Sequence, residues 1–349
     1  MSANPSCERV DEVMDFYSMN KRTDSARKVT MALPKKITIH ELGPREGMQI
    51  EKNPIATTEK IRLVDMLSEC HFAEIEVTSF VSPKWVPQMA DAEDVVAGMK
   101  RREGTRYTGV YLNTQGLQRA VMTQKLDVQG SLSVTASEAF SMKNTNRTIA
   151  ETFVETEKRI EGFQRFGVEA NEVSVMAAFG CNYQGDIDPD YVVGLIDRLM
   201  KMAADNGLNI EFIQLADTMG WANPLAMRRM VSKVQDRWPA QKINLHLHDT
   251  RGLGLANALA AMEMGVDDFD SAVAGLGGCP YAGFKDAPGN IVTEDLVHLC
   301  QEIGVETGVD LERLLVVARE AEIIVGHPLP GKVMRGGHLD SYRRAVAPN

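Results

Sequence analysis

The clearest structural pattern in this chain of 349 residues is INLHLHDTRGLGLANALAAMEMGVDDFDSAVAGLG, residues 243–277. It opens on an alternating, strand-like run, INLHLHD (243–249), and ends on a second such run, DDFDSAVAGLG (267–277). Between them GLGLANALAAMEMG (252–265) has apolar residues at helical spacing. A strand, a helix and a strand with short connections are typical of a parallel sheet with right-handed crossovers. The stretch therefore predicts one βαβ unit.

The same unit recurs along the chain from Lys36 onward, with segments of helical period such as 57–69 and 191–207 between the strands. The strand-like runs are 36–40, 74–80, 106–112, 131–136, 171–179, 209–217, 243–249 and 267–277. Eight such units over about 270 residues are what an α/β fold of the (β/α)8 TIM-barrel type requires. A doubly wound open sheet is the alternative, but no glycine-rich dinucleotide fingerprint follows the first run. We expect a TIM barrel.

The ends of the chain differ from this repeating region. Residues 1–33 mix acidic and basic side chains without an apolar core, so they fit neither a secretory signal nor a transit peptide. We predict a polar, disordered N-terminal arm over 1–33 and a barrel domain over 34–325, with its last helix at 309–325. Residues 326–349, which contain Pro and Gly, are predicted to form a C-terminal tail.

The bulk composition narrows the partners and the compartment. A formal net charge of −10 argues against nucleic acid as the main partner. No apolar run approaches the roughly 20 residues that a membrane span needs, so no membrane contact is predicted. The 5 cysteines are scattered and lack CxxC spacing, which indicates reduced thiols and a cytoplasmic protein.

Polar side chains gather where several predicted strands end, which is where a TIM barrel carries its active site. They are Glu41, Arg45, Glu46, Glu76, Thr78, Ser79, Asp217, Thr218, His246, His248, Asp249, Cys279 and Asn290. His246 and His248 point to one face of their strand, because successive side chains alternate. Several polar groups at one mouth are hard to explain as stability features alone.

Each residue also has a purely structural interpretation. Two histidines in a strand are often hydrogen-bonded barrel residues, and Asp217 could cap the following helix. Arg45 could form a rim ion pair worth under about 1 kcal/mol. Cys279 could be a small buried hydrophobe. The structural interpretation of all of them together requires several coincidences at one end of one barrel.

The chemistry of the set favours a site. Two imidazoles, one carboxylate and one amide carbonyl suit a divalent ion such as Mg²⁺, Mn²⁺ or Zn²⁺, which could lower the pKa of a bound hydroxyl. Arg45 could stabilise an enolate oxygen by charge-assisted hydrogen bonds. A cysteine on a glycine-rich loop could act as a general acid or base once the loop closes.

Motifs throughout the barrel carry a resemblance to a known family. They are HELGPREGMQIEKN (40–53), EVTSFVSPKWVPQMAD (76–91), EAFSMKNTNRT (138–148), LADTMG (215–220), HLHDTRG (246–252) and AGLGGCPYA (274–282). They resemble the 3-hydroxy-3-methylglutaryl-CoA (HMG-CoA) lyases of the HMGL-like superfamily of TIM-barrel metallolyases, over about residues 36–315. The HxH strand is shared with the synthases and carboxyltransferases of that group, whereas 76–91 and 274–282 are specific to the lyases.

The resemblance implies cleavage of HMG-CoA, or a related 3-hydroxyacyl-CoA, to acetyl-CoA and a keto acid such as acetoacetate. It implies a divalent metal, Mg²⁺ or Mn²⁺ with Zn²⁺ as the alternative, and a homodimer or homotetramer. The implied metal ligands are Glu46, His246, His248 and Asn290. The implied catalytic residues are Arg45, Glu76, Asp217 and Cys279, while Arg45, Gln49 and Thr218 would contact the substrate.

Two departures from the family pattern lie in this site. The family has Arg-Asp-Gly where this chain has Arg-Glu-Gly, so Glu46 carries one more methylene than the family's ligand. The segment 279–290 is longer than usual and contains Phe284, Lys285 and Asp286. The longer segment leaves the acyl specificity open.

Two other functions remain open. One is a condensing synthase on the same barrel, although such synthases usually carry a large C-terminal regulatory domain, for which the residues after Arg319 are too few. The other is a non-catalytic barrel that lost its metal when Glu46 replaced the family's aspartate and that binds a CoA thioester. Against this alternative, the metal-ligand and acid/base candidates other than Glu46 are all present. Lys52, Lys84 and Lys143 are candidates for CoA phosphate contacts, and each could equally be solvated surface.

Overall fold

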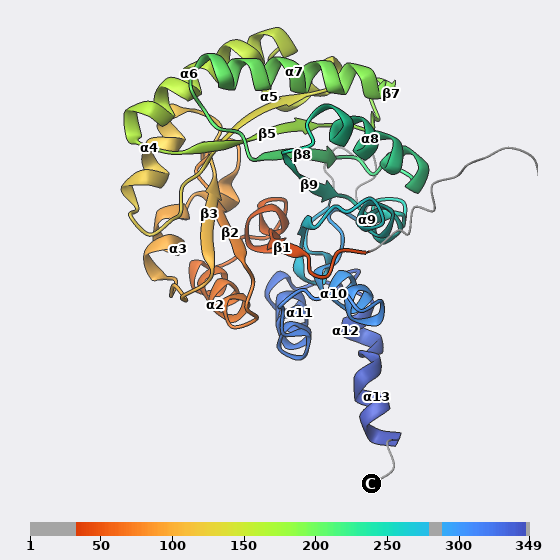
Figure 1. Ribbon diagram of the computed structural model, residues 1–349. Coiled ribbons are helices and arrows are strands. Elements are labelled where there is room, and N and C mark those ends of the chain that lie inside the picture. Colours follow the sequence, from red (N-terminus) through yellow and green to blue (C-terminus); the bar gives the residue numbers. More distant parts are fainter. Residues whose placement is uncertain (1–32, 279–287, 347–349) are drawn as a thin grey trace, which may run out of the picture. The chain divides into compact units, whose positions relative to one another are not determined.

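The computed structural model of the protein describes residues 33–278 and 288–346 (Figure 1). Within this part, eight parallel strands form one sheet, in the order β3-β2-β1-β10-β9-β8-β5-β4. The strands are β1 (Thr38–Glu41), β2 (Glu74–Ser79), β3 (Arg106–Val110), β4 (Gly130–Thr135), β5 (Ala170–Met176), β8 (Phe212–Asp217), β9 (Lys242–Leu247) and β10 (Asp268–Ser271). Each overlaps one predicted run, and the order is the cyclic order of a TIM barrel. The predicted fold is confirmed.

The sheet has a seam between β3 and β4, where the described residues form no strand ladder. Side chains and single backbone contacts bridge it instead. The backbone N–H of Asp127 donates to the carbonyl of Tyr107 (2.8 Å), and the Tyr111 hydroxyl donates to the carbonyl of Gln129 (2.6 Å). Because no strand ladder of the described residues joins β3 to β4, the interior of the barrel is open to the surrounding helices along this seam.

Helices surround the sheet and pack on its outer face (Figure 1). They are α2 (Thr57–Ser68), α3 (Ala92–Gly98), α4 (Thr114–Met122), α5 (Glu138–Thr145), α6 (Ile149–Phe166), α7 (Pro189–Asp205), α8 (Pro224–Arg237), α9 (Gly254–Met262), α10 (Thr293–Glu302) and α11 (Leu311–Val325). A short hairpin, β6 (Gly180–Cys181) with β7 (Gly185–Asp186), follows β5.

Local sequence explains where these helices begin. Thr148 and Glu151 form a reciprocal capping box at the start of α6. The Asn223 side chain accepts the backbone N–H groups of Leu225 and Ala226 at the start of α8, and Pro224 occupies the first helical position. These caps satisfy N–H groups that a helix cannot bond internally.

The alternation of side chains along each strand separates the core from the barrel interior. On β9, Leu245 and Leu247 are fully buried on the side that faces the helices, whereas Asn244 and His246 line the interior. Burying a leucine side chain fully contributes about 1.5–3 kcal/mol. The apolar layer between sheet and helices thus supports an interior that carries polar groups.

The C-terminal segment adds two further helices, α12 (Val333–Gly336) and α13 (Leu339–Val346), within the predicted tail. The Asp295 carboxylate on α10 accepts the backbone N–H groups of Lys332 (3.1 Å) and Val333 (2.8 Å), which ties α12 to the barrel. The predicted arm, 1–33, lies almost wholly outside the described residues and stays a prediction. No helix in the described part of the chain is long and apolar enough to cross a membrane.

Candidate active site

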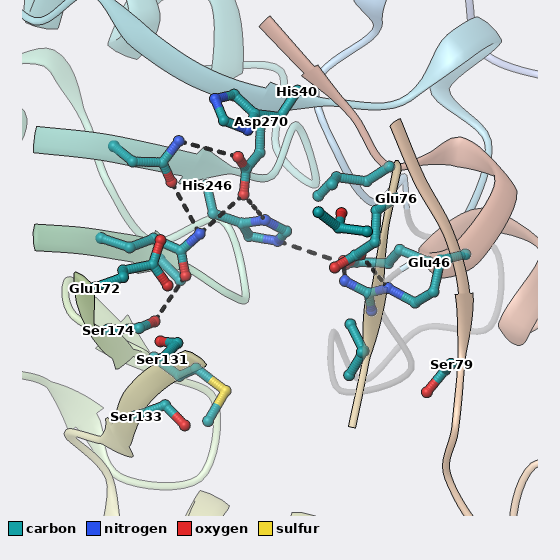
Figure 2. A pocket seen from close by; sticks show the side chains of 18 of the residues that line it. His40, Glu46, Glu76, Ser79, Ser131, Ser133, Glu172, Ser174, His246 and Asp270 are labelled. Carbon is teal, nitrogen blue, oxygen red and sulfur yellow. Dashed lines mark hydrogen bonds and ion pairs between the residues drawn. The ribbon is translucent and has the colours of Figure 1, made fainter. Parts of the chain in front are cut away.

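Three side chains from distant parts of the chain meet at the carboxyl end of the barrel. The Nε2 atoms of His246 and His248 are 3.2 Å apart. The Oε1 atom of Glu46 lies 3.5 Å from the first and 3.4 Å from the second. One ligand atom of each residue falls within 4.8 Å of the others, which is a spacing that can hold a metal ion. Figure 2 shows Glu46 and His246 pointing toward each other from opposite sides.

A tight turn at the end of β1 presents Glu46. Residues 43–47, GPREG, form a π-helical turn, η1 (Gly43–Gly47), a geometry often found at functional sites. The buried Glu41 carboxylate accepts the backbone N–H groups of Gly43 (2.8 Å) and Val273 (2.9 Å) and so holds this turn against the segment after β10. A Cβ atom on Gly47 would lie 2.7 Å from Leu276, which explains the glycine.

Asn290 lies beside the histidines, and its side-chain amide has no hydrogen-bond partner among the described residues. It forms an antiparallel bridge with His248, and its side chain is buried at 1% exposure. Neither its Oδ1 nor its Nδ2 has a hydrogen-bond partner among the described residues, and the same holds for His248 Nδ1. Buried polar atoms without partners are costly. A mixed oxygen and nitrogen set with an orphaned amide therefore fits a divalent ion.

Asp270 orients one of the histidines. His246 Nδ1 donates to Asp270 Oδ2 (3.0 Å), which also accepts from Gln214 Nε2 (3.1 Å). Asn244 Nδ2 donates to the other oxygen (3.0 Å). A carboxylate behind a histidine fixes the ring tautomer and directs Nε2 to the metal. Asp270 is not among the predicted site residues; alternation in DDFDS (267–271) puts it on the same face as Asp268 and opposite Phe269, and the structure turns that face inward.

Charges at this end of the barrel are tightly coupled. Arg45 bonds Glu76 through Nε and Glu46 through Nη2 (3.0 Å). Burial opposes the charge on Glu46, yet His246 and Arg45 hold the pKa of its carboxyl well below the usual range. Burial likewise opposes the charge on His246, but Glu46 and Asp270 raise its pKa to about 10. Burial lowers the pKa of His248.

Of the other predicted site residues, two line the cavity, one faces away from it and one lies outside the described residues. Gln49 and Thr218 line the same cavity as Glu46, His246 and His248, and the Thr218 hydroxyl accepts the backbone N–H of Ala177 (2.9 Å). Asp217 is turned to the other face of β8 and is not among the described residues that line this cavity. Its carboxylate accepts the backbone N–H groups of Trp221 (2.7 Å) and Ala222 (3.0 Å). Burial raises its pKa to about 6. Its acid/base role, like that of Cys279, which lies outside the described residues, stays a prediction.

The cavity at this site has a volume of about 460 Å³ and extends down into the barrel. The wall of the cavity farther from Glu46 is polar, whereas TIM-barrel interiors are normally filled by branched apolar side chains. Figure 2 shows Ser131, Ser133, Glu172 and Ser174 on the far side of His246 from Glu46 and Glu76. Burial raises the pKa of Glu172 to about 7. The volume is in the range of small-molecule sites.

Comparison with known proteins assigns the chain to a family. The HMGL-like family model matches residues 36–320. The chain belongs to the HMGL-like family. This HMGL-like chain is 42% identical over 283 residues to human mitochondrial hydroxymethylglutaryl-CoA lyase, covering 81% of this chain and 84% of the relative. The resemblance found in the motifs is therefore confirmed.

Two bacterial relatives support the same assignment. The HMGL-like chain is 38% identical over 296 residues to a Pseudomonas aeruginosa protein named 3-hydroxy-3-isohexenylglutaryl-CoA/hydroxymethylglutaryl-CoA lyase, covering 85% of this chain and 95% of that protein. An HMG-CoA lyase from Acinetobacter baumannii, solved with coenzyme A and 3-methylmalate, superposes with a TM-score of 0.79 at 37% identity. The match covers 90% of this chain and 98% of that one.

Proposed function

We propose that this HMGL-like protein is a metal-dependent carbon–carbon lyase. It cleaves HMG-CoA, or a related 3-hydroxyacyl-CoA, to acetyl-CoA and a keto acid, which for HMG-CoA is acetoacetate. The observation that carries the proposal is the meeting of Glu46, His246 and His248 beside Arg45 in one cavity. The names of the relatives supply the substrate.

Glu46, His246, His248 and Asn290 would hold a divalent ion, Mg²⁺ or Mn²⁺ with Zn²⁺ as the alternative. When bound, the ion supplies Lewis-acid polarisation of substrate oxygens. The orphaned amide of Asn290 and the converging Nε2 atoms support this ligand set. Asp270 keeps the Nε2 atom of His246 directed at the ion by accepting from Nδ1.

The chain's own residues direct the electron flow. Removal of the proton from the 3-hydroxyl group, for which Asp217 is the candidate base, turns the C3–O bond into a carbonyl and breaks the C2–C3 bond. The electron pair of that bond forms an enolate of acetyl-CoA. Arg45, held in place by Glu76 and Glu46, donates hydrogen bonds to the enolate oxygen. Cys279 returns a proton to C2, which completes acetyl-CoA.

The proposal also covers the binding partner, the oligomeric state and the cellular location of the enzyme. An acyl-CoA is the partner, with Lys143 as a candidate contact for its phosphates, since Lys143 lies over the Tyr183 ring at the barrel mouth (4.7 Å). A homodimer or homotetramer and a cytoplasmic location stay predictions. The human relative is named as mitochondrial.

The test is mass-spectrometric detection of acetyl-CoA after the purified protein is incubated with HMG-CoA, with Mg²⁺, with Mn²⁺ and after chelation. We expect metal-dependent release of acetyl-CoA, lost in Glu46→Gln and retained in Glu59→Gln. Glu59 is the matched control, because it pairs with Arg62 on helix α2, outside the cavity. Absence of release from folded, metal-binding protein would reject HMG-CoA as the substrate.

A further inference from the structure

Arg159 is a buried arginine in the middle of α6, with only 8% of its surface exposed. Its Nη2 atom donates to the Thr156 hydroxyl (2.9 Å) and to the Ser133 hydroxyl (3.2 Å). Its Nε atom is buried and has no hydrogen-bond partner among the described residues. The guanidinium is therefore held by neutral groups and only partly satisfied.

No carboxylate within the described part of the chain forms an ion pair with Arg159. Glu155, one turn earlier on the same helix, lies within ion-pair distance of Arg147 (4.0 Å) and Lys158 (3.8 Å), and it favours the charge of Arg159 only from a greater distance. Burial lowers the pKa of Arg159, which reflects the cost of keeping this charge away from water. An uncompensated buried charge destabilises a fold by several kcal/mol, so its retention calls for an anion that residues 33–278 and 288–346 do not supply.

The position of Arg159 connects it to the proposed active site. It lies at the seam between β3 and β4 and lines the same cavity as Glu46 and His246. Ser133, which it contacts, lies on the far side of His246 from Glu46 and Glu76 (Figure 2). A molecule bound at the metal-ligand set and extending across the cavity would reach this wall.

The other arginines that line the cavity are already neutralised. Among the described lining residues the arginines are Arg45, Arg106 and Arg159. Arg45 is paired with Glu76 and Glu46, and Arg106 with Glu74 (3.5 Å). Glu46 and Glu76 at the metal end would repel the free carboxylate of a substrate. Glu172 lies on the same wall as Ser133 (Figure 2), but burial raises its pKa to about 7, which reduces its charge near neutral pH. Arg159 is the lining arginine whose charge remains available.

We propose that Arg159 binds the free carboxylate of the 3-hydroxyacyl group, the one remote from the thioester, and selects dicarboxylic over neutral acyl chains. The inference rests on the proposed function and adds a specificity-determining residue to it. The neighbouring hydroxyls of Ser131 and Ser133 line the cavity beside it and can donate to the same carboxylate.

The first test uses glutarate, a dicarboxylate without CoA, titrated calorimetrically into chelated and Mn²⁺-loaded protein. We expect Arg159→Met to weaken glutarate binding by about 10- to 100-fold, the range for losing charge-assisted hydrogen bonds, and Arg159→Lys to recover part of it. Arg198→Met is the matched control, since Arg198 is an exposed arginine on α7 that stacks on the Phe153 ring of α6. It should bind glutarate as the wild type does.

The second test compares HMG-CoA with a neutral thioester in which a methyl group replaces its carboxylate. Arg159→Met should raise KM for HMG-CoA far more than KM for the neutral analogue, with a smaller effect on kcat. Equal losses on both thioesters, or unchanged glutarate binding, would overturn the inference. If Arg159→Met does not fold, Arg159→Lys decides, since wild-type glutarate affinity and an unchanged KM ratio between the two thioesters would both count against it.

The two proposals fail separately. Turnover of HMG-CoA that does not depend on Arg159 would reject the proposed role of Arg159 and support the lyase activity. Arg159-dependent glutarate binding in a protein that cleaves no thioester would support the carboxylate site and reject the lyase activity.

Discussion

Replacing Asp270 by asparagine should weaken metal binding without unfolding the protein. Asp270 accepts hydrogen bonds from three donors, His246 Nδ1, Gln214 Nε2 and Asn244 Nδ2. Asparagine keeps the shape but offers one oxygen and one NH₂ group, so at least one of these donors would face another donor. Loss of the charge also weakens the hydrogen bond that orients the His246 ring, because a neutral amide oxygen is a poorer acceptor than a carboxylate.

The expected loss is about 10- to 100-fold in metal affinity, as for other carboxylates behind a metal-binding histidine. This corresponds to about 1.4–2.7 kcal/mol. The assay is calorimetric titration of chelated protein with Mn²⁺, with thermal unfolding followed in parallel. Asp268→Asn is the control, because Asp268 lies two residues earlier on β10 and contacts His40 (3.0 Å) and Asn244 (2.6 Å) rather than His246, the proposed metal ligand. Mn²⁺ affinity within twofold of wild type in folded Asp270→Asn protein would refute the reasoning.

Three further predictions concern the proton donor, a buried carboxyl and the turn that presents Glu46. Cys279→Ala should reduce turnover of HMG-CoA by about a hundred- to ten-thousand-fold, measured as acetyl-CoA release, and near-normal turnover would exclude its assigned role. Burial raises the pKa of Glu294 from 4.5 to about 8, so the folded state retains a proton that the unfolded chain has lost. The stability from this group is present below about pH 4.5 and is lost as pH rises through 8, by about 1.4 kcal/mol per pH unit. Urea unfolding at several pH values should show a shallower decline in Glu294→Gln, and an unchanged slope would contradict this. Gly47→Ala should lower the free energy of unfolding by about 1–3 kcal/mol, because the new Cβ meets Leu276 at 2.7 Å, and a loss below about 0.5 kcal/mol in urea would show that the turn yields.

Several features of this protein follow from local sequence alone. Recurring strand and helix patterns predict eight βα units, and their order in the sheet is the one observed. Alternation along INLHLHD places His246 and His248 on one face before any tertiary contact is known. These features depend on backbone geometry over a few residues, so a single sequence is enough to predict them.

Alternation does not say which face of a strand turns inward. On β8 the sequence LADTMG drew attention to Asp217 and Thr218, which lie on opposite faces. In the structure Gln214, Ala216 and Thr218 line the cavity, while the Asp217 carboxylate accepts backbone N–H groups of the following loop. The direction of each face is decided by how the whole sheet curls, which no local pattern contains.

Only the tertiary structure brings Glu46 within 3.4 Å of His248, 202 residues further along the chain. The same holds for Arg159, whose helical pattern could not reveal that its guanidinium is buried at the β3–β4 seam beside Ser133. Contacts of this kind depend on strand order, on where the sheet fails to close and on which side chains fill the gap. Local sequence determined which groups each strand carries, and long-range packing decided which of them meet and which charges are left without a partner.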